Sequence, residues 1–171
     1  TALLADDITG SKTLAGLAAA SLSIGAAIAS FPLARIMARS GRRPGLLTGY
    51  VLASIGSFFA VLAAITRQFM FLPLGVALIG VGNATNMATR YAAADLAKPE
   101  RRASTIGLVV AATTIGSGFG SLVSLSVFDP FGRRFGLPDY AGSFLVGALL
   151  FLAAAAIVEI RLRPDPLVVA G

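Results

Sequence analysis

Apolar residues occur along this chain in long uninterrupted runs rather than in alternation with polar ones. Five stretches of 19 to 26 residues carry no Asp, Glu, Lys or Arg: 13–34, 44–66, 68–89, 103–128 and 140–158. A helix needs about 20 mostly apolar residues to cross a bilayer, whereas apolar runs in soluble proteins reach only about 14. Transmembrane strands would alternate between polar and apolar residues. The pattern predicts an all-α integral membrane protein with five transmembrane helices, over about 13–36, 44–66, 68–90, 103–128 and 140–160.

The composition excludes an ordinary soluble domain. Of the 171 residues, 56% are hydrophobic and 13% charged, with a mean hydropathy of +0.84, and soluble domains carry about 25% charged residues. We therefore expect residues 1–171 to form one partial helical bundle with no soluble domain. Since the chain has no Cys and no His, thiolate and imidazole chemistry are excluded. The chain is predicted not to be an enzyme, and we expect no cofactor and no metal site.

The distribution of positive charge predicts an orientation in the membrane. Lys and Arg lie at the ends of the apolar runs and form no continuous stripe, which argues against a nucleic-acid partner. The connections 35–43 and 90–102, together with the tail, carry ten of these residues, and the other connections carry four. Positive loops face the cytoplasm, so the chain start is expected outside and the chain end inside. The abundance of Ala, Gly and Arg is typical of a GC-rich bacterial gene, which places the protein in a bacterial plasma (inner) membrane.

The polar residues within the runs leave two interpretations open. Asn83 and Asn86 are one helical turn apart, so they share a face. They face a substrate, or they form interhelical hydrogen bonds worth about 0.6 kcal/mol each; the second interpretation is the one we favour. No run holds an ionisable residue well inside it, so a proton-coupling carboxylate would have to lie in sequence outside this chain. Asp6 and Asp7 are expected to be solvated acids at the outer edge.

Small residues predict where helices pack and where they end. Gly56, Ala60 and Ala64 recur every four residues, a spacing that lets helix backbones approach closely. A break between the last two helices is predicted from the turn-forming residues between 129 and 138, namely Asp129, Pro130, Gly132, Gly136 and Pro138. A weak similarity between 17–31 and 108–122, with five identities, is of the kind that a three-helix duplication in a secondary transporter leaves.

The most specific segment is Ala-Arg-Ile-Met-Ala-Arg-Ser-Gly-Arg-Arg-Pro at 34–44. Gly41 permits a tight turn, and the arginines can anchor it on an anionic leaflet. The segment resembles the loop that joins helices two and three in the major facilitator superfamily, G-x-L-A-D-R-x-G-R-R. Its Arg, Gly, Arg and Arg are matched by Arg39, Gly41, Arg42 and Arg43. Ala34 and Ala38 replace the leading Gly and the Asp, and in the family that Asp helps to lock the inner gate.

Two further segments resemble the same family. The connection between its helices four and five is similar to 90–102, which contains Arg90, Asp95, Arg101 and Arg102. In its antiporter signature G-x8-G-x3-G-P-x2-G-G, the first three glycines are matched by Gly107, Gly116 and Gly120. Ser121 replaces the Pro, and Ser124 and Leu125 replace the final Gly pair. Together with Gly118, the matched glycines are expected either to pack in a tight bundle or to let a moving helix bend or slide.

The resemblance covers 14–162 and implies a function. The five spans would be helices two to six of the amino-terminal six-helix half, so we expect the chain to be a piece of a longer protein. Helix one, the carboxy-terminal half, the lipid bilayer and a small-molecule substrate would be its partners. The implied activity is secondary transport by alternating access, in the manner of a drug–proton antiporter that exports its substrate. A non-transporting scaffold or accessory subunit explains the small residues and the uncharged spans equally well. A membrane-embedded enzyme ranks last, because no nucleophile, acid or metal ligand is visible within the spans.

Overall fold

The computed structural model describes residues 1–95 and 97–163, except for the side chain of residue 125. The described residues form nine helical segments: α1 Ala2–Thr9, α2 Lys12–Ser40, α3 Arg42–Thr66, α4 Phe71–Asp95, η1 Pro99–Arg101, α5 Arg102–Val123, η2 Ser124–Phe128, α6 Asp129–Arg134 and α7 Ala141–Arg161. Within these residues, α2, α3, α4, α7 and the segment 99–123 are long and apolar enough to cross a membrane. The predicted all-α fold with five membrane-spanning helices is confirmed. The tail after residue 163, which the charge count places in the cytoplasm, lies outside the described residues.

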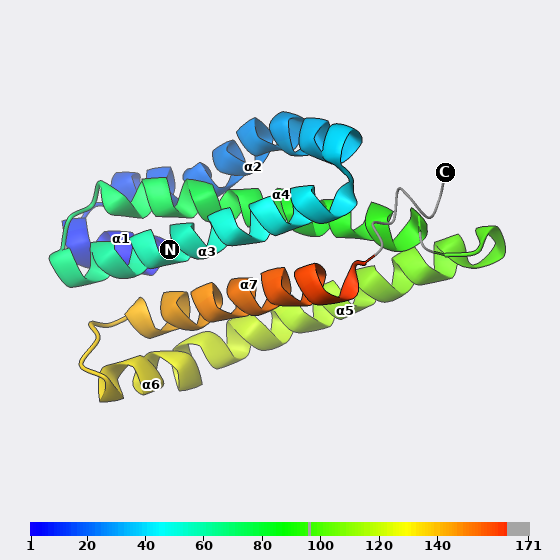
Figure 1. Cartoon of the computed structure of the whole chain (residues 1–171). Helices are drawn as coiled ribbons and strands as arrows, with labels where there is room; N and C mark the ends of the chain where they lie inside the picture. The colour runs from blue at the N-terminus through cyan, green and yellow to red at the C-terminus, as the bar shows by residue number, and fades with distance from the viewer. Residues whose placement is uncertain (96, 164–171) are drawn as a thin grey trace.

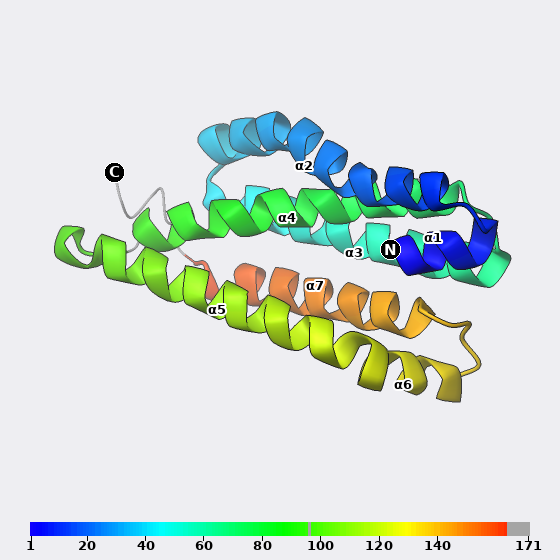
Figure 2. The same cartoon turned by 180° about the vertical axis from the view of Figure 1, so that it is seen from behind.

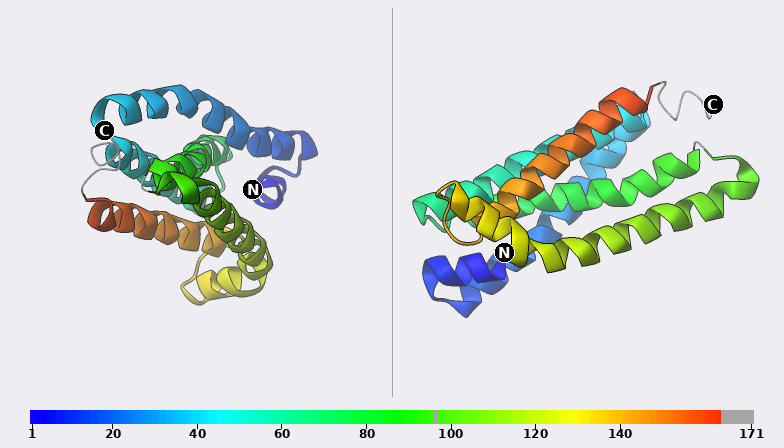
Figure 3. Two further views of the ribbon diagram at one scale, coloured as in Figure 1. Left: turned by 90° about the vertical axis from the view of Figure 1, so that its right-hand side faces the viewer. Right: turned by 90° about the horizontal axis from the view of Figure 1, so that it is seen from below.

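The long helices run alongside one another, and their connections gather at two ends of the bundle (Figures 1 and 2). One end holds α1, the α3–α4 connection and the α6–α7 connection; we call it the outer end, following the charge count. The opposite, inner end holds the turn at Gly41 and the end of α7 (Figure 1). α3 packs against α2, α4 and α7. In contrast, α5 diverges from that group along much of its length (Figure 3).

Glycines bring the backbones of α2, α3 and α4 into direct contact. A Cβ on Gly56 of α3 would lie 2.5 Å from the carbonyl oxygen of Gly75 on α4, and one on Gly80 of α4 would lie 2.8 Å from the amide nitrogen of Ala26 on α2. Ala60 and Ala64, at the four-residue spacing from Gly56, are 0% and 2% exposed. Lipid tails are as apolar as these helices, so close packing through small residues holds the group together.

The glycine contacts predict different effects for the same substitution at two sites. Gly80→Ala should destabilise the full-length protein by about 3 kcal/mol, because the methyl group meets backbone that cannot yield. Gly107→Ala on α5 should change the stability by less than about 1 kcal/mol, since its Cβ meets no described atom and Ala is the better helix former. Thermal unfolding in detergent measures both. Equal losses for the two variants would contradict the packing described here.

The helix that begins at Arg102 continues further than the turn-forming residues predict. The break between the last two helices does fall within 129–138, but it starts later than Asp129, because α5 passes through the π-helical turn η2 into α6 and the chain leaves the helix only after Arg134. In η2 the backbone N–H of Asp129 bonds to the carbonyl of Ser124, five residues back. The hydrogen-bond register therefore shifts just before Pro130, whose missing N–H is tolerated in the first turn of α6. Gly136, with φ 75°, then forms the actual turn.

Candidate functional site

The segment 39–43 forms a sharp turn at the inner end. Gly41 has φ 103° and ψ 167°, a conformation that favours glycine, and its N–H bonds to the Met37 carbonyl at 3.2 Å. Helix α3 begins at the next residue, so Arg42 and Arg43 lie in its first turn. Cations at a helix N-terminus oppose the helix dipole, whose positive end lies there. These two arginines therefore need nearby anions.

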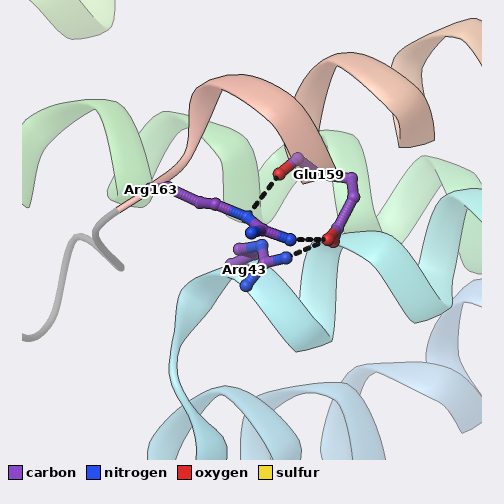
Figure 4. Close-up of polar contacts among 3 residues, drawn as sticks. All are labelled: Arg43, Glu159 and Arg163. Carbon is purple, nitrogen blue, oxygen red and sulfur yellow. Dashed lines mark hydrogen bonds and ion pairs between the residues drawn. The ribbon is translucent and has the colours of Figure 1, made fainter.

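Acids at the ends of two other helices meet these arginines. The Nε of Arg42 lies 2.9 Å from Oδ2 of Asp95, the last residue of α4. Arg43 pairs with Glu159 in the last turn of α7, and Arg163 pairs with the same carboxylate (Figure 4). Each acid sits at the negative end of its helix, where it is also unfavourable alone. When the arginines at the N-terminus of α3 pair with the acids at the C-termini of α4 and α7, the unfavourable charge–dipole interaction at each helix end is offset.

The five residues Arg42, Arg43, Asp95, Glu159 and Arg163 form what we call the inner ion cluster. The Arg42–Asp95 pair is about three-quarters buried, with side chains 26% and 27% exposed. Beneath the cluster, Met37 and Leu46 form a small core with residues of α4 and α7. The cluster therefore ties α3 to α4 and α7 at one end of the bundle.

The other predicted residues of the two inner connections lie apart from this cluster. Arg39 is exposed in the last turn of α2, and Arg101 and Arg102 are exposed at the start of α5. Arg90 is half-buried on α4, one turn inside the membrane from Asp95. The inner end thus has two kinds of arginine. Those of the inner ion cluster are paired with acids, whereas Arg39, Arg101 and Arg102 are exposed and available to lipid headgroups.

The glycines of α5 do not approach the backbone of any described neighbouring helix, unlike Gly56 of α3 and Gly80 of α4. A Cβ built on Gly107, Gly116, Gly118 or Gly120 meets no described atom within 4 Å. None of the residues of α5 is buried, and Leu108, Ile115, Phe119 and Leu122 are 69–76% exposed. Within this chain these glycines do not fill a tight bundle.

The two asparagines lie on α4 without the hydrogen bonds that we favoured for them. Asn83 is exposed and Asn86 is half-buried, and neither makes a hydrogen bond to any residue that the structure describes. Interhelical hydrogen bonds do occur nearby, from Ser54 to the Ala148 carbonyl at 3.0 Å and between Tyr50 and Thr89 at 3.0 Å. Other polar residues therefore form the interhelical bonds in this part of the bundle.

Sequence reasoning missed two acids. Glu159 follows the last apolar run directly, and an acid at the inner end of a span is a signal that could have paired it with an arginine-rich loop. Asp129 belongs to the predicted break, but its side chain is 3% exposed and its Oδ2 lies 3.6 Å from a guanidinium nitrogen of Arg133. Its burial follows from a close crossing of α6 and α7, where a Cβ on Gly132 would lie 2.6 Å from the Gly142 Cα. That crossing could not be read from the sequence.

These features define a multi-pass helical membrane protein whose inner end is held by an arginine-rich loop. Residues 1–169 match the sequence profile of the Major Facilitator Superfamily, and the chain belongs to that superfamily. It is 36% identical over 170 residues to YdeG of Bacillus subtilis, described as an uncharacterized MFS-type transporter, with 99% of this chain and 39% of that protein covered.

Two further relatives resemble the chain over nearly its whole length. YddS of Bacillus subtilis, also described as an uncharacterized MFS-type transporter, is 34% identical over 168 residues, with 98% of this chain and 38% of that protein covered. The riboflavin transporter RfnT of Brucella anthropi is 24% identical over 170 residues, with 96% and 41% covered. The chain thus spans about two fifths of the length of these curated relatives. No solved structure matches it significantly.

Proposed function

We propose that the full-length protein transports a small molecule across a membrane by alternating access. In this proposal, residues 1–171 form part of the amino-terminal six-helix half, and helix one and the carboxy-terminal half complete the protein. The inner ion cluster is the observation that carries the proposal. It closes one end of the bundle with ion pairs between helix termini, which can separate and re-form when the bundle rocks. Arg42 and Arg43, which the turn at Gly41 places at the start of α3, would act as this lock, and the exposed Arg39 would lie beside it.

The direction and the coupling ion belong to the same proposal. We take transport to be export in exchange for protons, across a bacterial inner membrane with the inner ion cluster facing the cytoplasm. The glycine spacing of α5, which is similar to an antiporter signature, and the charge asymmetry of the connections support this assignment. The open glycine face of α5 would lie against the carboxy-terminal half and slide on it.

Asn83 and Asn86 are the residues that we assign to the substrate. They lie near the middle of α4, the depth at which secondary transporters hold their substrates, and the described residues leave their amides unbonded. Because one relative is named a riboflavin transporter, riboflavin is the neutral reference compound for transport assays of the full-length protein in proteoliposomes.

Cysteine labelling tests alternating access without knowledge of the substrate. Cysteine at Ser104, exposed near the inner end of α5, or at Ser121, exposed near its outer end, would be labelled with a membrane-impermeant maleimide in vesicles of each orientation. Neutralising the lock by Arg42→Gln with Asp95→Asn should favour the inward-open state. The labelling rate at residue 104 should then rise and that at residue 121 should fall, each by about fivefold.

The control is a cysteine at Phe58, which is 45% exposed on α3 and whose labelling should not respond. If neutralising the lock raises both rates together, the cluster stabilises the fold and does not gate transport. If neither rate changes, the alternative of a non-transporting scaffold or accessory subunit gains the support that the proposal loses.

A further inference from the structure

One face of α4 carries polar residues that lead from the middle of the helix toward its inner end. Val76, Asn83 and Arg90 follow one another at intervals of seven residues, just under two helical turns, so they lie on the same face. Asn86 lies on this face as well, one turn from each of Asn83 and Arg90. With a rise of about 1.5 Å per residue, Asn83 and Arg90 are about 10 Å apart along the helix.

Helix α1 covers only the outer part of this face. Leu4 and Ala5 are buried in a core that includes Leu72 and Val76. Inward of that core the face is open: Asn83 is exposed, Met87 is 50% exposed, and Asn86 and Arg90 are half-buried. The face therefore changes from a covered apolar part to an open polar part at mid-membrane.

Arg90 is a half-buried cation for which the described residues provide no anion. Its Nε atom is inaccessible to solvent and makes no hydrogen bond. At the same end of the bundle, Asp95 and Glu159 are engaged with Arg42, Arg43 and Arg163. A cation held this close to the membrane interior without an anion is costly. Because protein atoms cover the Nε, an acceptor from elsewhere would have to meet the two Nη atoms of the half-buried side chain.

We propose that this face of α4 binds a small amphipathic carboxylate. The carboxylate binds Arg90, whose planar guanidinium suits that group better than an ammonium would. Met87 contacts the apolar body of the ligand. Asn86 and Asn83 bond to polar groups about 6 Å and about 10 Å deeper in the membrane. This inference names the substrate class of the proposed transport site and so rests on the proposed function.

Matched pairs of compounds test the charge preference on the full-length protein. Thermal unfolding in detergent would be followed with benzoate and benzamide, and with nicotinate and nicotinamide, pairs in which a neutral amide of similar size replaces the carboxylate. We expect the carboxylates to raise the unfolding midpoint by about 3 °C and the amides to leave it unchanged. Arg90→Gln should weaken carboxylate binding at least about tenfold and Arg90→Lys should weaken it less. Arg101→Gln, which removes an exposed cation from the same end, should have no effect.

Two other outcomes would overturn the assignment of a carboxylate to this face of α4. If neither carboxylate stabilises the wild-type protein, or if Arg90→Gln binds them as well as wild type, the face does not select an anion. If instead Arg90→Gln lowers the unfolding midpoint in the absence of any ligand and no carboxylate binds, the partner of Arg90 is an acidic side chain elsewhere in the polypeptide. Reciprocal cysteine labelling is measured without ligand. If that labelling is observed but no carboxylate binds, this inference is wrong and the transport proposal stands. If carboxylates bind but the labelling is not reciprocal, the transport proposal is wrong and the anion site stands.

Discussion

Replacing Gly116 with leucine is expected to reduce transport by the full-length protein at least about tenfold while leaving its expression and unfolding midpoint at the wild-type level. The reason is the environment of α5. A side chain at Gly116 meets no described atom within 4 Å, so it does not disturb the packing of α2, α3, α4 and α7. A large side chain on this face would instead obstruct the surface on which we propose that the other half of the protein slides. Transport in proteoliposomes and reciprocal cysteine labelling at residues 104 and 121 would both record the loss.

Gly16→Leu is the matched control for this experiment. Gly16 of α2 also has open space around an added Cβ and is exposed, so the same substitution adds the same apolar volume to the surface. Its transport should stay within about twofold of wild type. Normal transport by the Gly116→Leu variant would show that the glycine face of α5 does not move against a partner. Equal losses in both variants would point to a general effect of added bulk.

The helical fold could be predicted from the sequence because the bilayer constrains it strongly. A segment in hydrocarbon must satisfy every backbone N–H and C=O within itself, so an uncharged run of 20 residues leaves few alternatives to a helix. The runs at 44–66 and 103–128 therefore indicate helices without any knowledge of their neighbours. At the ends of helices this constraint weakens. There the sequence does not show that the helix continues from Asp129 to Arg134, nor that a short helix, α1, is packed by Leu4 and Ala5.

Spacing alone could not tell which small residues make contacts. Gly56 and Ala60 of α3 are four residues apart, as are Gly116 and Gly120 of α5. The first two contact the backbone of α4 at Gly75, and the last two meet open space. The difference depends on which helices are adjacent, and adjacency follows from the three-dimensional arrangement of the whole bundle. The same holds for the inner ion cluster, where Arg43 and Glu159 are 116 residues apart. The resemblance of 34–44 to a known loop marked the arginines, but only the fold identifies their acids.

Exchanging the charges of Arg42 and Asp95 is expected to restore a function that either reversal alone destroys. Arg42→Asp would place two carboxylates, and Asp95→Arg two guanidinium groups, where one 2.9 Å ion pair now joins α3 to α4. Each single variant should lose the lock and reduce transport about tenfold. In the double variant the pair is rebuilt in reverse, with the acid at the N-terminus of α3 and the cation at the C-terminus of α4. Both charges then agree with the helix dipoles, so the unfolding midpoint should equal or exceed that of wild type. Transport should return to within about threefold.

The ion pair between Arg67 and Asp7 at the outer end provides the control for this exchange. It has the same 2.9 Å length, but its side chains are 62% and 42% exposed, so solvent screens most of its contribution. Reversing either of these charges should change transport by less than about twofold. A double Arg42→Asp, Asp95→Arg variant that transports no better than the single variants would contradict the lock. The two charges would then act separately, each through its own neighbours, and the closure of the inner end would depend on Arg43 and Glu159 instead.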